Sequence, residues 1–266
     1  MPRRGRAMAL HATYYAANGW LLEFGALRVL VDPWLIGPLE FPPGPWLFRG
    51  TLPRPWPVPE EIDLLLLTQG LPDHCHPPTL ALLDHDLPVV GSLTAAARVR
   101  DLGFGRVTAL APGETHRLGA LRITATAGAP VPQVENGYLL EHPEGSLFLE
   151  PHGFLAVDLP ERTLDAVITP VVDLGLPLAG AFVKGREALP LLLARFRPRT
   201  VLASTAGGDV RSEGLLPRLL WQKGSATEAE SLIRRHATQR GDQLPSRFID
   251  PVPGERYVLA TAVITG

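Results

Sequence analysis

The chain has 266 residues, of which 45% are hydrophobic and 20% charged, and its formal net charge is −2. This composition supports a globular domain with a large core and gives no reason to expect binding to nucleic acid or to an anionic membrane. No apolar run approaches about 18 residues, so we expect no transmembrane helix. The basic start at residues 1–6 lacks a signal-peptide continuation, and one cysteine excludes an internal disulfide; both features are typical of a cytoplasmic protein.

The N-terminal part of the chain is predicted to form mainly strands. Residues 19–24 and 27–32 are predicted to pair as a hairpin, because a Gly25-Ala26 link joins two apolar runs. Residues 63–68 are continuously apolar, which is typical of a short strand buried on both faces. Further strands are expected at residues 11–17, 87–92, 106–110 and 119–127, and a hairpin at 136–150.

The segment of residues 37–61 is rich in proline. Proline lacks a backbone donor and fixes φ, so this segment should be neither a helix nor a central strand. It also contains Phe41, Trp46, Phe48 and Trp56. We therefore expect an ordered loop that packs on the body through its aromatic side chains, in a position to cover a pocket.

From residue 77 onward, helices alternate with strands. The predicted helices cover residues 77–86, 93–103, 184–196 and 226–239. The later strands are expected at 165–172, 200–205 and 256–264. This alternation predicts an α/β protein with two sheets face to face and helices outside them, a four-layer αββα arrangement.

The stretch "LLTQGLPDHCHPPT" (residues 66–79) places potential metal donors in succession, at Asp73, His74, Cys75 and His76. A buried strand that ends in such residues would hold them on rigid backbone at one edge of a sheet, which suits a metal site. In a second interpretation, Asp73 only caps the helix predicted to follow. Cys75 fits a small buried side chain better than a nucleophile.

The segments "NGWLLEFGALRVLVDPWL" (18–35) and "LLLLTQGLPDH" (64–74), followed by a later hairpin, resemble the metallo-β-lactamase superfamily, and within it the lactonase-like metallohydrolases. The resemblance covers nearly the whole chain. It implies one domain, residues 1–266, with the αββα sandwich of that superfamily and two related halves, about 1–150 and 151–266. It also implies a metal site after the strand at 63–68, where the family carries His-x-His-x-Asp-His.

The metal motif of this sequence departs from that of the family. Gln69 and Leu71 stand where the family has its first two histidines, whereas Asp73 and His74 match the second pair. Leucine cannot bind a metal, and a glutamine oxygen is a weak ligand for zinc. The usual first metal of the family is therefore not expected here.

Later family ligands are also replaced. Residues 126–129 contain no histidine, and Ser204 and Thr205 stand where the last family histidine is expected. His152, in the sequence "EPH", stands roughly where the family has its bridging aspartate. A complete dinuclear site cannot be assembled from these residues.

The remaining donors predict an unusual mononuclear site. Its candidate ligands are Asp73, His74, His76, Glu150 and His152, and the ion would be zinc, manganese or iron. With Asp73, His74 and His152 as candidate catalytic residues, such a site would hydrolyse a small ester, lactone or phosphoester. Without any metal, His74 or His152 would remain available as a general base.

Two other interpretations stay open. The protein could be a non-catalytic member that keeps the pocket for a small-molecule ligand or a partner, because four family histidines are missing. Glu150 and His152 could also simply end a hairpin through hydrogen bonds to the backbone. A nuclease is disfavoured by the nearly neutral charge and by the missing histidines.

Overall fold

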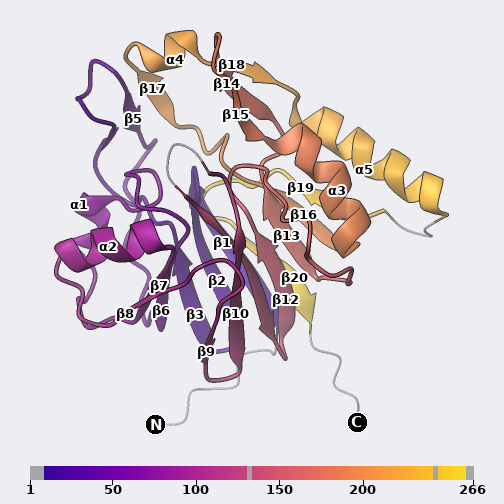
Figure 1. Ribbon diagram of the computed structural model, residues 1–266, viewed down its shortest axis with the longest axis horizontal. Coiled ribbons are helices and arrows are strands. Elements are labelled where there is room, and N and C mark those ends of the chain that lie inside the picture. Colours follow the sequence, from indigo (N-terminus) through magenta and orange to yellow (C-terminus); the bar gives the residue numbers. More distant parts are fainter. Residues whose placement is uncertain (1–8, 131–133, 242–244, 262–266) are drawn as a thin grey trace.

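The computed structural model describes residues 9–130, 134–241 and 245–261. Within these residues the chain forms a sandwich of two mixed sheets with helices on both outer faces (Figure 1), which confirms the predicted αββα architecture. The basic residues 1–6 and the end of the strand predicted at 256–264 lie outside the described part. No helix of the described part is long and apolar enough to span a membrane.

The first sheet contains seven described strands, which come mainly from the N-terminal half. Their order across the sheet is β20 (Arg256–Thr261), β1 (Ala9–Ala16), β2 (Gly19–Phe24), β3 (Leu27–Val31), β6 (Leu64–Leu67), β7 (Val89–Gly91) and β8 (Val107–Ala109). The strand from the C-terminal end, β20, pairs antiparallel with β1. β6 lies between β3 and β7, parallel to both, and all four of its leucines are buried, as its apolar run predicts.

The second sheet also contains seven described strands and combines residues from both sides of position 150. Their order is β19 (Arg247–Ile249), β16 (Thr200–Ala203), β13 (Ala166–Thr169), β12 (Gly145–Leu149), β11 (Asn136–His142), β10 (Leu121–Ala127) and β9 (Thr115–Leu118). The main core lies between the two sheets and includes Tyr14, Trp20, Leu140 and Ile168. Whether the two halves of the chain are related stays a prediction.

Two small sheets stand at one end of the sandwich, near the top of Figure 1. One consists of β15 (Gly180–Lys184), β14 (Asp173–Leu176) and β18 (Trp221–Lys223). The other consists of β17 (Arg211–Glu213), β5 (Arg49–Thr51) and β4 (Leu39–Glu40). These short strands were not predicted, because their sequences, unlike that of β6, are not continuous apolar runs and are too short to show an alternating pattern.

The described helices are α1 (Pro77–Leu80), α2 (Leu93–Asp101), α3 (Gly185–Phe196), α4 (Leu216–Leu219) and α5 (Ala226–Arg240). α2 packs against β7 and β8, and α3 packs against β13 and α5. The helix predicted at residues 77–86 is wrong beyond Leu80. The carboxylate of Asp84 accepts a hydrogen bond from the Asp86 N–H at 2.9 Å, and its backbone carbonyl binds the N–H of Leu87, so a turn replaces the helix.

The proline-rich segment is ordered, as predicted, but the prediction that it holds no central strand is wrong, because the proline-free β5 lies between β17 and β4. Trp56 is buried, and Phe41 and Phe48 pack against the core that lies between the first sheet and α2. Trp46 differs, because its side chain remains mostly exposed. The segment therefore stays attached to the body while presenting one large aromatic side chain to solvent.

Candidate metal centre

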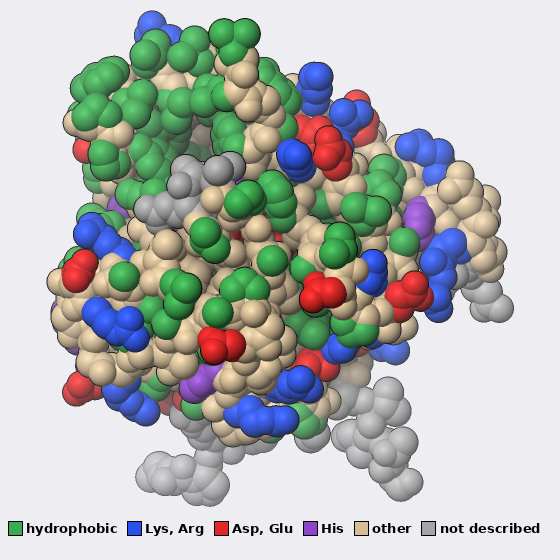
Figure 2. Space-filling view, viewed as in Figure 1, with side chains coloured by type: hydrophobic (Ala, Val, Ile, Leu, Met, Phe, Trp, Pro, Cys, Tyr) green, Lys and Arg blue, Asp and Glu red, His purple; other side chains and the backbone are tan. Residues whose placement is uncertain are grey.

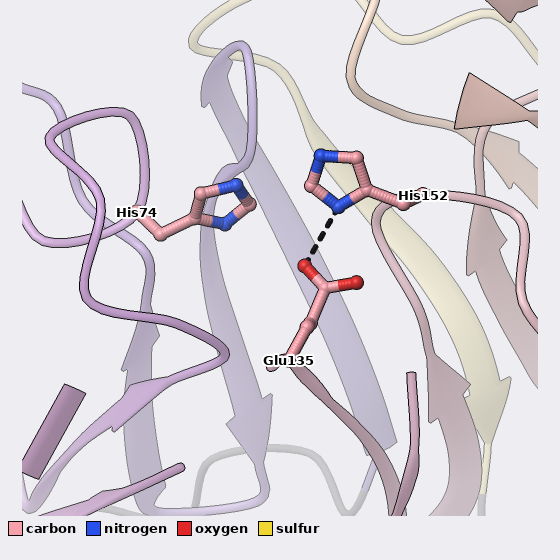
Figure 3. A group of neighbouring side chains, drawn as sticks. All are labelled: His74, Glu135 and His152. Carbon is pink, nitrogen blue, oxygen red and sulfur yellow. Dashed lines mark hydrogen bonds and ion pairs between the residues drawn. The ribbon is translucent and has the colours of Figure 1, made fainter. Parts of the chain in front are cut away.

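Three buried side chains converge between the ends of the two sheets (Figure 3). His74 follows β6, Glu135 precedes β11, and His152 follows β12. One ligand atom from each lies within 4.8 Å of the other two, so the three could hold one metal ion. The Glu135 Oε1 atom is 2.7 Å from His152 Nδ1, and the two imidazole ring centroids are 5.3 Å apart.

The orientation of His74 is set by Asp32, which directly follows β3. The Asp32 Oδ2 atom is 2.8 Å from His74 Nδ1, so this nitrogen carries a proton that it donates to the carboxylate. Thr68 holds the same carboxylate: its N–H donates to Oδ1 at 2.8 Å and its hydroxyl to Oδ2 at 2.5 Å. These contacts direct the other ring nitrogen, Nε2, toward the shared space.

Several polar side chains surround Nε2 of His74. Asn18 Nδ2, Gln69 Nε2 and Asp73 Oδ2 each lie 3.2 Å from it. Within the described residues, the amide oxygens Asn18 Oδ1 and Gln69 Oε1 and the other carboxylate oxygen, Asp73 Oδ1, are buried and have no hydrogen-bond partner. Buried oxygens without partners are costly, and a side-chain amide can turn its oxygen toward the space that its nitrogen now faces. The site therefore has unused oxygen ligands around one histidine nitrogen.

The charges in this region are coupled. Burial disfavours the charged form of His74, but the carboxylates of Asp73 and Asp32 outweigh burial and hold the pKa of its imidazole well above the usual value. Burial likewise opposes ionisation of Asp73, yet His74 and His152 lower the pKa of its carboxyl group. The cluster thus favours the ionised carboxylate of Asp73 and the protonated imidazole of His74.

Four of the five residues predicted as metal ligands lie in or beside this cluster. His74 and His152 face each other, and Asp73 contacts His74. Glu150 is close by but points into its own loop, where its carboxylate accepts the N–H of His152 at 3.1 Å and the N–H of Gly153. Burial, reinforced by the charge of Glu135, raises the pKa of Glu150 well above its usual value. Glu150 shapes the loop that carries His152.

The fifth predicted ligand, His76, lies apart from the cluster. Its Nδ1 atom is 2.9 Å from the Thr79 hydroxyl, and its Nε2 atom is 3.1 Å from the Pro38 carbonyl oxygen. The Thr79 hydroxyl accepts the N–H of Leu35, so it donates to Nδ1, and Nε2–H donates to Pro38. Burial lowers the pKa of His76, which keeps the ring neutral. The structure thus engages both ring nitrogens in joining two loops.

Glu135 was not recognised from the sequence. The family pattern directed attention to residues 126–129, at the end of β10, where the structure has no metal-binding side chain. Glu135 enters the same space from the start of the next strand, and Gln69 Nε2 donates to its Oε1 atom at 3.1 Å. The one available signal was an acidic residue directly before the hairpin predicted at residues 136–150.

The other positions considered in the sequence have structural contacts. Asp32 orders the neighbouring loops through the hydrogen bonds described above. Ser204 accepts a hydrogen bond from the Trp20 indole at 3.2 Å. The Thr205 hydroxyl donates to the Pro151 carbonyl at 2.5 Å. Cys75 is fully buried, as predicted for a small core side chain.

Two packed sheets with a cluster of histidine and carboxylate side chains at their ends place this protein in the class of αββα sandwich folds that includes metallohydrolases. The family model described as "Beta-lactamase superfamily domain" matches residues 11–204, and the chain belongs to this superfamily. No curated protein matches the chain in sequence.

Similar solved structures agree on the fold. Igni18, a metallo hydrolase from Ignicoccus hospitalis, is 14% identical with a TM-score of 0.62, over 94% of this chain and 98% of that one. An isothiocyanate hydrolase from Delia radicum gut bacteria is 17% identical with a TM-score of 0.65, over 94% and 99%. CmlA, a diiron beta-hydroxylase from Streptomyces venezuelae, is 18% identical with a TM-score of 0.62, over 98% and 55%. The fold is therefore shared by proteins of different chemistry.

Proposed function

We propose that this protein is a metal-dependent hydrolase that binds one divalent ion through His74, Glu135 and His152. The observation that carries the proposal is the convergence of one ligand atom from each residue within 4.8 Å. Two histidines and one glutamate form a ligand set known for hydrolytic zinc sites, and two histidines with one carboxylate also suit iron(II). Zinc, iron and manganese are therefore the ions to test.

Two further observations support the fit of a metal ion. Histidines that bind metals commonly donate their other ring N–H to a carboxylate, and Asp32 accepts such a bond from His74 at 2.8 Å. In addition, the buried oxygens Gln69 Oε1 and Asp73 Oδ1 have no hydrogen-bond partner within the described residues. A cation beside His74 would give these oxygens the favourable contact that they lack.

A divalent ion supplies Lewis acidity, which polarises a carbonyl or phosphoryl oxygen and favours ionisation of a water molecule. The residues of the chain supply the rest. The Asp73 carboxylate is partly exposed and has a lowered pKa, so it is ionised at neutral pH and can accept the proton of an attacking water. The amide N–H of Asn18 can donate to a substrate oxygen next to His74. The substrates that suit this arrangement are small esters, lactones and phosphoesters.

A second function is supported by a different observation. Glu135 Oε1 already contacts both His152 Nδ1, at 2.7 Å, and Gln69 Nε2, at 3.1 Å, so these polar groups have hydrogen-bond partners without an ion. With Gln69 and Leu71 at the positions of the first two family histidines, the protein would then be a non-catalytic member. In this case the pocket would bind a small-molecule ligand without turnover.

Metal analysis of protein purified without chelators separates the two functions. The first predicts about one equivalent of zinc, iron or manganese, strongly reduced in His152→Ala. His76→Gln is the matched control, because it changes a histidine two positions after His74 whose nitrogens are engaged elsewhere. Metal-free protein that binds none of these ions on titration would refute the hydrolase proposal and favour the second function.

A further inference from the structure

Exposed apolar side chains gather at one end of the molecule. Trp46, Leu215 and Leu219 have exposed fractions of 62%, 47% and 45%, and Leu178 is fully exposed. Figure 2 shows hydrophobic side chains around a hollow at this end, where Figure 1 places β5, β17 and α4. We call Phe41, Trp46, Phe48, Leu178, Leu215 and Leu219 the apolar hood. Contiguous exposed apolar surface of this kind marks a binding site more often than isolated leucines do.

The hood has a defined structure. The N–H of Leu215 donates to the Trp46 carbonyl at 3.0 Å, and that of Leu216 to the Leu47 carbonyl at 2.8 Å. The strands below these contacts, β5 and β17, pair antiparallel. Gly214 has a φ of +111°, and a Cβ atom there would approach the Leu47 carbonyl oxygen to 2.6 Å. The aromatic loop and the α4 segment are thus fixed against each other although they lie far apart in the sequence.

Two of the hood segments are connected to loops beside the candidate metal centre. The aromatic loop follows Asp32, and its Pro38 carbonyl accepts a hydrogen bond from His76. The α4 segment is preceded by Thr205, whose N–H donates to the Ala17 carbonyl at 3.1 Å, next to Asn18. Both segments therefore rise from loops that contact His74 or its neighbours.

The third hood segment is the hairpin of β14 and β15, with Leu178 at its tip. β14 pairs with β18, which starts two residues after α4. At the other end of the hairpin, the N–H of Lys184 donates to the His152 carbonyl at 2.8 Å. The hairpin thus connects the loop of His152 with the rim of the hood.

We propose that the hood binds the hydrocarbon chain of an amphiphilic substrate whose polar group lies at the metal centre. This inference rests on the proposed function and adds the substrate class, an ester with a long alkyl chain. The hood is concave in Figure 2, and each of its three segments is tied by a hydrogen bond to a loop in or beside the polar site; apolar walls combined with a few polar groups are typical of small-molecule sites. A hydrocarbon chain would cover the exposed Trp46, Leu215 and Leu219 without needing charged partners.

Binding is tested independently of catalysis with a bromo-substituted undecanoate, whose bromine quenches nearby tryptophan fluorescence. Trp46 is the exposed reporter in the hood. We expect saturable quenching in the wild type and about tenfold weaker binding in the double variant Leu215→Ser, Leu219→Ser, because both leucines lose apolar contact. The control Leu191→Ser changes a leucine of α3 that is 57% exposed and lies outside the hood, and it should bind like the wild type.

Three results would overturn the inference. They are the absence of saturable quenching, equal weakening in Leu191→Ser and in the double variant, and self-association or vesicle binding that the double variant abolishes. Sedimentation of the wild type and of the double variant, alone and with neutral phospholipid vesicles, distinguishes these cases. The last outcome would assign the hood to a second copy of the chain or to a membrane surface.

The catalytic part is tested with p-nitrophenyl esters from acetate to dodecanoate. We expect kcat/KM to rise about threefold for each CH₂ group that enters the hood, and this rise to flatten in the double variant. His152→Ala should lose turnover but keep saturable quenching. Quenching without turnover of any ester in the metal-loaded wild type would refute the hydrolase proposal while leaving hydrocarbon binding by the hood supported.

Discussion

Asp32 Oδ2 and His74 Nδ1 lie 2.8 Å apart, and this contact joins the end of β3 to the loop after β6. Both side chains are buried. The same carboxylate also accepts the N–H and the hydroxyl of Thr68. A single side chain therefore links two neighbouring strands and fixes the ring that faces the candidate metal centre.

Asp32→Asn should destabilise the protein and weaken metal binding. The amide NH₂ replaces one acceptor oxygen and leaves a buried N–H or O–H without a partner, so we expect the free energy of unfolding to fall by about 3 kcal/mol. Loss of such a carboxylate behind a ligating histidine commonly costs about 10- to 100-fold in metal affinity. Urea unfolding and metal titration measure the two effects. Asp158→Asn, at an exposed position, is the control, and an equal loss of stability there would contradict the assignment.

Glu135→Gln and Glu150→Gln should have different effects although both residues are buried glutamates. Glu135 reaches the shared space, so its change should reduce metal affinity by at least about tenfold. Glu150 accepts backbone N–H groups and has a raised pKa, so an uncharged glutamine oxygen can take over part of its role, and metal affinity should change much less. Isothermal titration of the two variants with zinc measures the difference. A larger loss in Glu150→Gln would reassign the ligand.

Gly153→Ala should disturb the loop that carries His152. Gly153 has a φ of +78°, and its Cβ atom would lie 2.5 Å from the backbone carbon of Lys184. Gly119→Ala is the matched control, because Gly119 has a φ of +57° with no atom within 4 Å of its Cβ position. We expect a loss of about 1 kcal/mol for the control, from backbone strain, and clearly more for Gly153→Ala. Equal losses in thermal unfolding would show that the loop can move away.

Cys75 provides a reporter of the site that does not depend on activity. Burial, together with the charge of Asp32, raises the pKa of its thiol to about 12, so the native thiol is protonated below that pH. Thiolate is the reactive form, so labelling between pH 7 and 9 should require opening of the structure. We expect slow labelling. Zinc should slow it further, because binding of the ion stabilises the native state, and a chelator should restore the labelling rate measured without zinc. Rapid labelling that is insensitive to zinc would contradict both the burial and the metal site.

Much of the architecture follows from local sequence patterns. The four leucines of β6, the hairpin of β2 and β3, and the helices α2 and α5 were predicted because their apolar spacing and end residues extend over several positions. Ser92 and Ser225 cap these two helices with their side chains, as residues of this type do. The short strands β17 and β18 escaped prediction because they pair with segments far away in the chain, β5 and β14, and the two residues of β4 are too few to form a recognisable pattern.

The residues of the candidate metal centre were also only partly predictable from the sequence. His74 and His152 could be named from the sequence because each follows a recognisable strand at a position where the resembled family places ligands. Glu135 could not, because it precedes its strand and reaches the site only when β11 lies beside β10 and β12. The sequence likewise could not separate Glu150 from Glu135, since both are acids beside apolar runs.

The sequence alone thus determined the layered fold and the loss of the first two family histidines, because both depend on residue type and spacing along the chain. The tertiary structure decided which polar groups share one space. It brought Glu135 to His74 and His152, turned Glu150 into its own loop, and joined His76 to Thr79 and Pro38. The physical reason is that a buried polar group must find its partners in three dimensions, and some partners, such as Asp32 for His74 and Gln69 for Glu135, lie tens of residues away along the chain.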